Sequence, residues 1–518
     1  MSLLAVVLLL PLIGFFLLLW APRDSKLPFT TAFGTTLITF LISLGLIGAV
    51  LKNPARFTSE INRLWVDSPG LQIRLHLGVD GVNLWLVLLT TLLLPIGVWI
   101  SRSMIKTRQK NFYALLLLFQ FGLVGVFTAV DLFIFYIFWE VALVPMYLMV
   151  GGWGGGQRGP TAVKFFVYTF LGSVFMLGSI LYLHSQTNTF DYVELTNGMG
   201  SGRISLDPGQ QLLLFLGFFA AFAVKVPIFP LHTWLPATYT QAPAPATFLL
   251  AGVMSKMGAY GLIRFALPLA PAGAHRSAGW VAALAIVGII YGALLALVQT
   301  NIKTLLAYSS VSHLGFIVLG IFTFDQQGAD GAVYQMIAHG LSTGALFILA
   351  GYMEERRGSM NIEDFGGWAN FAPKLATTFM IAMLASIGLP TLCNFIGEFL
   401  VLQGAALVRF SWSVWAAIGV ILSAAYMLWL YQRTFLGKTR HQHEEHHKRF
   451  DLRPAELAPV AVLIGLMVWL GVYTQSFMPP ITSATGHLLD LTSISNQYRV
   501  DLQKRIVPVQ VAEASGAR

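Results

Sequence analysis

Four charged residues stand alone within long apolar segments of this chain. Glu140 lies in FIFYIFWEVALVPMY, Lys225 in FFAAFAVKVPIFP, Lys256 in LLAGVMSKMGAYG and Glu398 in PTLCNFIGEFLVL. A charge at the depth of a membrane is costly, so such residues usually mark the path of an ion or a proton. The pattern therefore predicts a chain that moves charge across a membrane.

Glu140 and Lys225 are an acid and a base that can compensate each other. A buried carboxylate without a cation is unfavourable, and pairing with a lysine lowers the cost of both groups. A lysine enclosed by apolar side chains also gives up its proton more readily than a lysine in water. We therefore expect Lys225 to be a proton-loading site. The alternative for Glu140 is a structural carboxylate bonded to a backbone amide or an arginine.

Lys256 and Glu398 extend this set of charges along the chain. Lys256 is too deep in its segment to reach either surface easily, and its alternative role is that of a counter-ion for another carboxylate. Glu398 has two interpretations. It either caps the second half of a broken helix, where the helix dipole favours a carboxylate, or it ends a proton relay.

Three histidines also lie in apolar segments. They are His232 in PLHTWLP, His313 in AYSSVSHLGF and His339 in YQMIAHGLSTGALF, and Lys303 precedes the second of them. A lone histidine among apolar residues is often only a hydrogen-bonded packing residue. Histidine nevertheless titrates near neutral pH and can pass a proton through either ring nitrogen. We expect these four residues to support a proton relay.

Other kinds of site find little support. Several histidines gather between residues 441 and 447, but that segment is a polar loop, and we interpret it as solvated rather than as a metal site. Cys393 is the only cysteine, so the chain cannot build a thiolate cluster of its own. The glycine run at 151–156 follows no strand, which argues against a nucleotide-binding loop. We expect no metal or cofactor site in this chain.

The composition is that of a membrane protein. Of the 518 residues, 56% are hydrophobic and 11% are charged, whereas about a quarter are charged in a soluble domain. The formal charge of +9 does not indicate nucleic-acid binding, because the cations lie in short loops. Apolar runs predict an all-α polytopic fold of about fourteen transmembrane helices. Their approximate positions are 2–20, 30–51, 80–100, 112–130, 132–151, 162–184, 210–230 with a continuation to 245, 247–268, 278–298, 303–323, 331–352, 374–408, 412–434 and 457–477.

Loop charges predict the orientation of the helices. Lysine and arginine are enriched in the loops that follow odd-numbered helices, with the loop 52–79 as an exception. Because such loops stay on the inner side, both termini are predicted on the outer side. The apolar N-terminus lacks a basic start and is followed closely by a second apolar run, so we expect a retained first span rather than a signal peptide.

A weak internal repeat links the two helices that contain prolines or glycines near a charge. Lys225 lies beside Pro227, and Glu398 follows Gly388 and Pro390. Their separation corresponds to five helices, so two such units would have opposite orientations in the membrane, as in transporters built from inverted repeats. We expect four regions: 1–110 with helices 1–3, 111–268 with the first repeat, 269–435 with the second repeat, and 436–518 with a loop, helix 14 and a tail.

Six longer sequence motifs are distributed from the fourth predicted helix to the twelfth. They are FWEVALVPMYLMVGGWGG, KVPIFPLHTWLPATYTQAPAP, LLAGVMSKMGAYGLIRF, KTLLAYSSVSHLGF, QMIAHGLSTGALF and IGLPTLCNFIGEF. With these motifs the chain resembles the antiporter-like, proton-translocating membrane subunits of respiratory complex I, the NADH–quinone oxidoreductase. Most related subunits have lysine where this chain has Glu398. The glutamate resembles the M-type subunit, which is called chain 4 in mitochondria.

This resemblance implies two inverted five-helix repeats, two broken helices and a role for each buried charge. Glu140 and Lys225 match the ion pair of the first half-channel, Lys256 the central lysine, and Glu398 the charged residue of the second broken helix. His232, His313, His339 and Lys303 match polar positions on the connecting axis. The family pattern is not complete, because Ala237 and Tyr239 replace the usual Asp and His, and Thr391 stands where glycine is frequent.

The resemblance also implies a setting. NADH, FMN, iron–sulfur clusters and quinone would be bound by partner subunits, and neighbouring antiporter-like subunits would flank this chain in the inner membrane of a bacterium. The predicted function is proton translocation coupled to quinone reduction elsewhere in the complex. Three alternatives remain open, namely a subunit of a multisubunit Na⁺/H⁺ antiporter, a subunit of a related membrane-bound hydrogenase complex, and a scaffold that conducts nothing.

Overall fold

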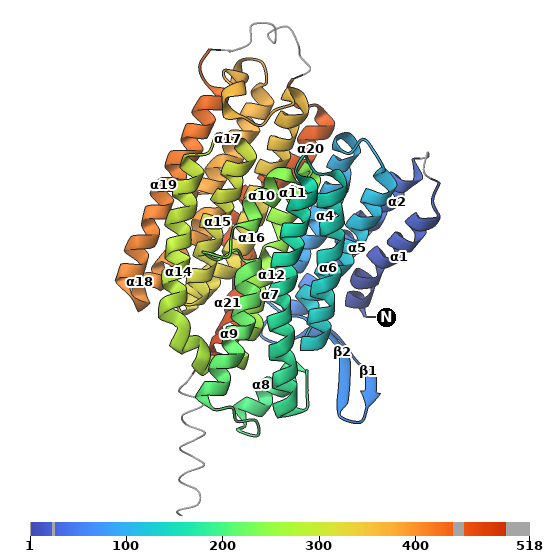
Figure 1. The fold of residues 1–518 in the computed structure, drawn as a ribbon, viewed down its shortest axis with the longest axis vertical. Helices are drawn as coiled ribbons and strands as arrows, with labels where there is room; N and C mark the ends of the chain where they lie inside the picture. The colour runs from blue at the N-terminus through green and yellow to red at the C-terminus, as the bar shows by residue number, and fades with distance from the viewer. Residues whose placement is uncertain (1, 23–25, 439–449, 494–518) are drawn as a thin grey trace, which may run out of the picture.

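The computed structural model describes residues 2–22, 26–438 and 450–493, and most of them are helical (Figure 1). Thirteen helical runs in this part of the chain are long and apolar enough to cross a membrane. Twelve of them are α1 Leu3–Trp20, α2 Leu27–Ser43 with α3 Gly45–Val50, α4 Leu84–Met104, α5 Gln109–Thr128, α6 Leu132–Trp153, α7 Arg158–Thr187, α9 Pro208–Lys225, α14 Pro271–Leu297, α15 Ile302–Ile321, α16 Gln326–Arg357, α19 Phe410–Phe435 and α20 Pro454–Val472.

The thirteenth crossing, Ala244–Leu269, is not a regular α-helix. It is composed of α11 Ala244–Leu249, the π-helix η1 Leu250–Met254, α12 Lys256–Gly261, the π-helix η2 Leu262–Ala266 and α13 Leu267–Leu269. Wider π turns of this kind occur frequently at functional sites. The shorter helices α17 Pro373–Ile387 and α18 Cys393–Val408 together make a fourteenth crossing. The polytopic helical fold is thus confirmed.

Two of the crossings are broken, as expected. The first break separates α9 from α10, Trp234–Gln241, at a segment that contains Pro227 and Pro230. The second separates α17 from α18, where Gly388 has a φ of +85° and Thr391 a φ of +79°. A β-branched residue rarely adopts such a φ, which explains why glycine would suit position 391. In Figure 1, α9 lies below α10 whereas α17 lies above α18, so the two broken helices run in opposite directions.

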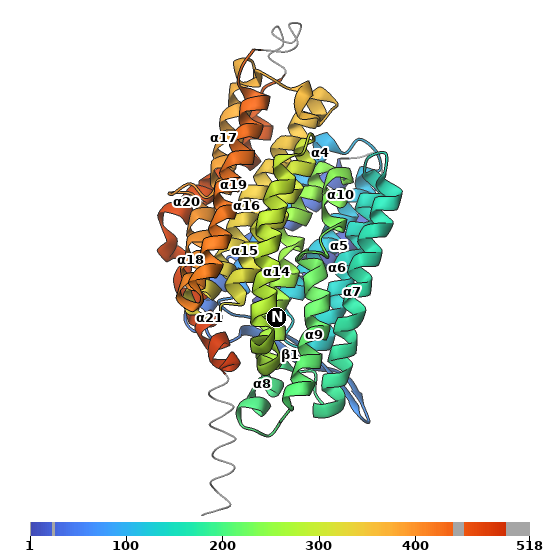
Figure 2. The same cartoon turned by 60° about the vertical axis from the view of Figure 1, so that its left-hand side comes forward.

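The centre of the bundle consists of the crossing Ala244–Leu269 and of α16. Both are completely buried over their apolar windows, and α4 and α15 are nearly so, whereas only about a third or less of α1, α2 and α20 is buried. Figure 2 shows α7 and α9 side by side at the edge of this core. Helices with apolar residues on all sides belong inside a bundle of this size. The central helices therefore keep their polar groups away from lipid.

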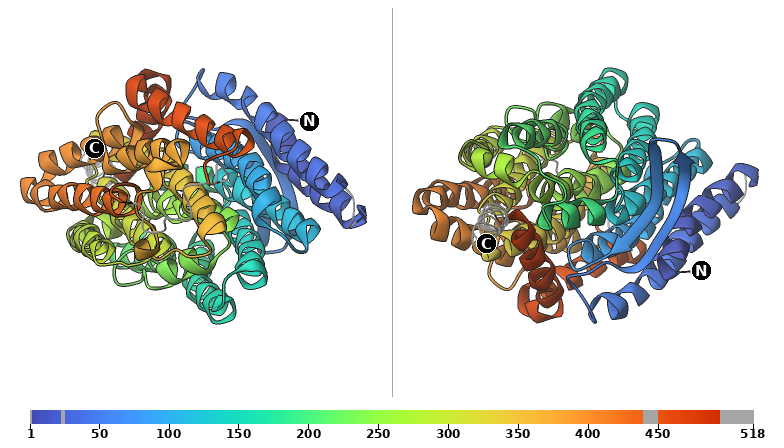
Figure 3. Two further views of the ribbon diagram at one scale, coloured as in Figure 1. Left: turned by 90° about the horizontal axis from the view of Figure 1, so that it is seen from above. Right: turned by 90° about the horizontal axis from the view of Figure 1, so that it is seen from below.

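A β-hairpin lies within the segment 52–79, which we predicted as a loop between two helices. Strands β1 Thr58–Ser68 and β2 Leu71–Val79 pair antiparallel, and Gly70 turns between them with a φ of +78°. Strand β1 contacts α1, and β2 contacts α5 and α6. The hairpin lies across one end of the bundle, where α1 begins and where α8 Tyr192–Gly200 and α21 Met478–Thr492 also lie (Figures 1 and 3). The hairpin adds two strands to the predicted helical fold, in a segment where no helix was predicted.

A buried ion pair links the hairpin end to the central crossing. Arg264, in η2, donates from Nη2 to both carboxylate oxygens of Asp80 at 2.6 Å. Asp80 also accepts the backbone amides of Val82 and Asn83, which lie just before α4. Arg264 is a fifth charge within a membrane-length apolar run, and we had not predicted a role for it. Because both side chains are almost fully buried, each depends on the other for compensation.

The replacement Asp80→Ala should destabilise the protein by about 3–5 kcal/mol, because it leaves the Arg264 guanidinium buried without its carboxylate. The free energy of unfolding in a detergent titration measures this loss. Glu355→Ala is the matched control, since it breaks the exposed pair that Lys106 forms with Glu355 at 3.1 Å. That pair should contribute less than about 1 kcal/mol. Equal losses in the two variants would contradict the account.

Candidate functional site

Glu398 is the centre of a buried polar cluster just after the second helix break. Its Oε1 lies 2.7 Å from Nδ1 of His313, on α15, and accepts a hydrogen bond of 2.9 Å from Nε2 of Gln335, on α16. All three side chains are buried. Gly388 at the break faces the carboxylate, because a Cβ there would lie 3.2 Å from Oε2. The break therefore leaves room for an acid that three helices surround.

Lys256 occupies the junction between η1 and α12. The wide turn before it exposes the carbonyl of Ala251, which accepts a hydrogen bond from the Lys256 ammonium. The same Nζ donates to Oγ of Ser255 at 3.2 Å and lies 2.8 Å from Nδ1 of His339, on α16. While Lys256 is an ammonium it can only donate, so Nδ1 of His339 is then the acceptor of this contact and Nε2 carries the ring proton. The π turn thus positions Lys256 against a proton acceptor.

The two histidines connect these clusters. The ring centroids of His313 and His339 are 5.8 Å apart. The structure therefore brings together four of the predicted residues in one row through the core, in the order Lys256, His339, His313 and Glu398. They come from four different helices, and each side chain is buried. A row of titratable groups at such spacing can hold and pass protons.

Lys225 and Glu140 are near each other but are not in contact. Among the ion pairs of the described residues, none joins their charged atoms within 4 Å, so a direct salt bridge is absent. The ammonium of Lys225 instead faces aromatic rings, 5.4 Å from the centroid of Trp139 and 5.7 Å from that of Phe165. Its Nζ and Oε1 of Glu140 lack a hydrogen-bond partner in the protein. Ring faces stabilise the cation only modestly, so its protonation depends on more distant charges.

Close packing of two helices brings Lys225 near the row. A Cβ on Gly258, in α12, would lie 2.7 Å from the carbonyl oxygen of Phe222 and 3.0 Å from Cβ of Lys225. Only glycine permits this approach of α12 to α9. Lys256 is two residues from Gly258 and faces α16 instead. The helix α12 therefore separates Lys225 from the row by its own width.

His232 and Lys303 lie apart from the row. His232, at the first break, is buried against Phe229 and Tyr291, with centroids 5.8 and 5.6 Å away. Lys303 starts α15 and pairs with Glu354 at 2.5 Å, a partly exposed carboxylate near the end of α16. This contact is at the opposite end of the bundle from the hairpin. Lys303 thus contacts a partly exposed carboxylate rather than the buried histidines.

Three polar residues of the site were not predicted. Gln335 bonds Glu398, Ser386 lies 3.5 Å from Nε2 of His313, and Lys164 donates to the carbonyl of Thr233 at the first break. Neutral amides and hydroxyls are common in membrane helices, so their presence alone carries little signal. Lys164 stands near the start of an apolar run, and its charge was a usable signal that we did not follow.

The part of the chain that the structure describes contains no group of three or more His, Cys, Asp or Glu side chains able to hold a metal ion. Cys393 is buried and is not part of a disulfide. The histidines between 441 and 447 lie outside the described residues. The titratable side chains that the core does contain, Lys, His and Glu, are groups that can bind and release protons.

Comparisons with known proteins show which family this chain is similar to. A family model described as NADH:quinone oxidoreductase/Mrp antiporter, TM, matches residues 129–425. The protein named NADH-quinone oxidoreductase subunit M of Rhodobacter capsulatus is 40% identical over 490 residues, covering 93% of this chain and 92% of the relative. The protein of the same name from Rickettsia prowazekii is 38% identical and covers 94% and 99%.

Solved structures show the same fold. A chain of the respiratory complex I from Thermus thermophilus with bound NADH superposes with a TM-score of 0.85 at 32% identity, over 95% of this chain and all of that chain. A chain of the Mrp complex from Dietzia sp. DQ12-45-1b has a TM-score of 0.83 at 21% identity, over 96% and 99%, which is a likeness of fold alone. This chain belongs to the NADH:quinone oxidoreductase/Mrp antiporter family of membrane proteins.

Proposed function

We propose that this chain is a proton-translocating membrane-arm subunit of an NADH–quinone oxidoreductase, and that it couples quinone reduction elsewhere in the complex to proton pumping. The relatives named NADH-quinone oxidoreductase subunit M, similar over nearly the whole chain, support this assignment. NADH, FMN, iron–sulfur clusters and quinone are then bound by partner subunits. The chain itself lies among other membrane-arm subunits in the inner membrane of a bacterium, with both termini on the outer side.

The row Lys256–His339–His313–Glu398 is the observation that supports proton transfer most strongly. A scaffold gains nothing from four titratable side chains stacked in its core, since each is costly to bury. In our proposal Glu140 and Lys225 are the coupled pair, Lys256 is the middle carrier and Glu398 is the distal one. His339 and His313 relay between the last two. His232 and Lys303 have supporting roles at the first break and at one end of the bundle.

The proposed mechanism is electrostatic. A charge change in the neighbouring subunit alters the field that Glu140 exerts at Lys225. Because the Lys225 ammonium has no hydrogen-bond partner in the protein, small changes in that field decide whether it keeps its proton. Water must carry the proton across the gap from Lys225 to Lys256. From Lys256 the proton passes to Nδ1 of His339, and the opposite ring nitrogen of His339 releases another proton toward His313. His313 in turn passes a proton to Glu398.

The regions predicted from the sequence can each be given a part in this mechanism. We propose that residues 111–268 form the unit that loads the proton and 269–435 the unit that delivers it. Residues 1–110 and 436–518 then surround these two units. The opposite directions of the two broken helices support this division, because they give each unit access from a different side of the membrane.

Replacing Lys225 with Met, which keeps the length of the side chain but binds no proton, should leave the complex assembled. Pumping-coupled electron transfer should fall at least about tenfold, since a positioned acid–base group is lost. NADH oxidation and acidification of inverted membrane vesicles measure this effect. Glu140→Ala should act in the same direction. Lys106→Met, at an exposed lysine, is the matched control. Normal coupled turnover in Lys225→Met would overturn its assignment.

The substitution Glu398→Gln should also reduce pumping by at least about tenfold, because the amide can still accept the Gln335 hydrogen bond but cannot take up a proton. Assembly should be unchanged, as judged by native electrophoresis of the solubilised complex. Glu355→Gln applies the same chemical change to a carboxylate outside the row and should be neutral. Equal effects of the two variants would argue against Glu398 as the distal carrier.

Sodium provides the test between the two leading functions. In vesicles that lack an electron donor, a Na⁺ gradient should produce no ΔpH that depends on Lys225 or Glu398. NADH oxidation should produce one. A ΔpH driven by Na⁺ alone, and lost in Lys225→Met, would instead establish the antiporter function.

A further inference from the structure

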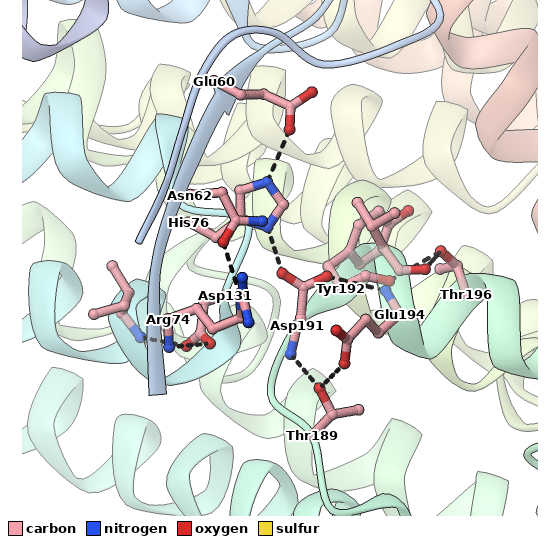
Figure 4. Close-up of polar contacts among 12 residues, drawn as sticks. Glu60, Asn62, Arg74, His76, Asp131, Thr189, Asp191, Tyr192, Glu194 and Thr196 are labelled. Carbon is pink, nitrogen blue, oxygen red and sulfur yellow. Dashed lines mark hydrogen bonds and ion pairs between the residues drawn. The ribbon is translucent and has the colours of Figure 1, made fainter. Parts of the chain in front are cut away.

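A buried histidine on the hairpin is held between two carboxylates (Figure 4). Nδ1 of His76, on β2, bonds Oδ2 of Asp191, and Nε2 lies 3.1 Å from Oε2 of Glu60, on β1. His76 and Asp191 are each about 3% exposed, whereas the Glu60 side chain reaches solvent. Ionised carboxylates only accept hydrogen bonds, so both contacts are satisfied together when both ring nitrogens carry protons. The position between two carboxylates therefore favours the positively charged imidazolium.

This contact joins three elements at the start of α6. The backbone carbonyl of His76 accepts the amide of Val130 at 2.9 Å, and Val130 in turn accepts the amide of Tyr192 at 3.0 Å. Leu132, the first residue of α6, donates to the carbonyl of Phe190 at 3.0 Å. The segment before α6 is therefore enclosed by the hairpin on one side and by the start of α8 on the other. Helix α6 is the helix that carries Glu140.

The other charged side chains around Asp191 and Glu60 have partners elsewhere or are themselves acidic. His76 is therefore the cation that compensates these two carboxylates. Asp131 caps α6 by accepting the amides of residues 133 and 134, and it faces Asp191. Arg74 directs its guanidinium to Asn62 instead, and Glu194 accepts a hydrogen bond from Thr189. Arg264 is engaged by Asp80. Within the described chain, His76 is the one cation within 4 Å of Asp191 or Glu60.

We propose that His76 is a protonation site at the hairpin end of the molecule and acts as a pH-dependent clamp on α6. As an imidazolium it ties Glu60 and Asp191 together and holds the first turn of α6. When the ring loses a proton, the two carboxylates face each other with only one hydrogen bond between them and the ring, and the clamp loosens. The pH on this side of the membrane thereby regulates the helix that carries Glu140. This regulatory role rests on the proposed function of Glu140.

The direction of the pH effect follows from the folded state. Burial lowers the pKa of His76, but the hydrogen bonds and charges of Asp191 and Glu60 outweigh it, so the pKa of His76 is raised above 6.5. The stabilisation is complete below that value and is lost as the pH rises through the raised pKa. Burial also raises the pKa of Asp131 from 3.8 to about 6, against the backbone amides it accepts. Because the pKa of Asp131 is higher in the folded protein, its ionisation between about pH 4 and pH 6 also weakens the contact between the hairpin, α6 and α8.

Hydrogen–deuterium exchange of the purified complex in lipid nanodiscs tests the clamp, because it reports on the backbone without requiring turnover. Protection of the amides in 71–79 and 129–134, corrected for intrinsic exchange, is followed from about pH 5.5 to about pH 8.5. The protection of these amides should fall on the order of tenfold as the pH rises across this range. His76→Gln should abolish this transition. His184→Gln is the matched control, since His184 only stacks on Phe190 nearby and should preserve it.

Glu60→Gln keeps the proposal testable if His76→Gln does not assemble. It removes the charge of the exposed partner only, so the transition should remain but move to lower pH. Protection that is flat in the native complex, or a transition that is unchanged in Glu60→Gln or His76→Gln, would overturn the clamp. The two proposals fail separately. A complex that shows the transition but does not pump contradicts the proposed function, and one that pumps without the transition contradicts the clamp.

Discussion

The cost of holding a charge away from water is the constraint on which this structure depends. Glu398 and Lys256 are each compensated by groups from other helices, whereas the Lys225 ammonium only faces aromatic rings. Glu398 depends on α15 and α16, and Lys256 on α16. The two completely buried crossings, Ala244–Leu269 and α16, carry Lys256 and His339 and lie at the centre of this arrangement. Removing one partner leaves the other in a poorer environment, so proton affinity and packing are coupled.

Irregular backbone is the device that makes this compensation feasible. A regular helix uses all of its carbonyls and amides internally, whereas the π turn before Lys256 offers the carbonyl of Ala251 to the ammonium. The break at Gly388 opens space beside the Glu398 carboxylate. Such backbone is tolerated within a membrane only where protein encloses it. The breaks and π turns lie where the titratable side chains need room and partners, in the middle of the bundle.

Sequence reasoning identified the charges well and their contacts poorly. An isolated Lys256 or Glu398 in an apolar run is visible to any reader, because its cost does not depend on the neighbours. Which residues touch depends on helix packing, and the expected direct pairing of Glu140 with Lys225 is absent since Lys225 faces aromatic rings. The π turns left no trace in the sequence. The hairpin did have a signal in the sequence, because β2 alternates apolar and polar residues after a Pro-Gly turn. A prediction based on long apolar runs does not register such a short alternating strand.

Infrared difference spectroscopy during a single turnover tests the central claim most directly. If protons travel along the row, reduction of the complex by NADH should change the protonation of the Glu398 carboxyl, which appears as a band of a protonated acid that shifts in D₂O. That band should disappear in Glu398→Gln and lose intensity when His313 is replaced by Gln, because His313 is its proton donor in our account. A difference spectrum that Glu398→Gln leaves unaltered, in a complex that still pumps, would show that protons cross the membrane by another route.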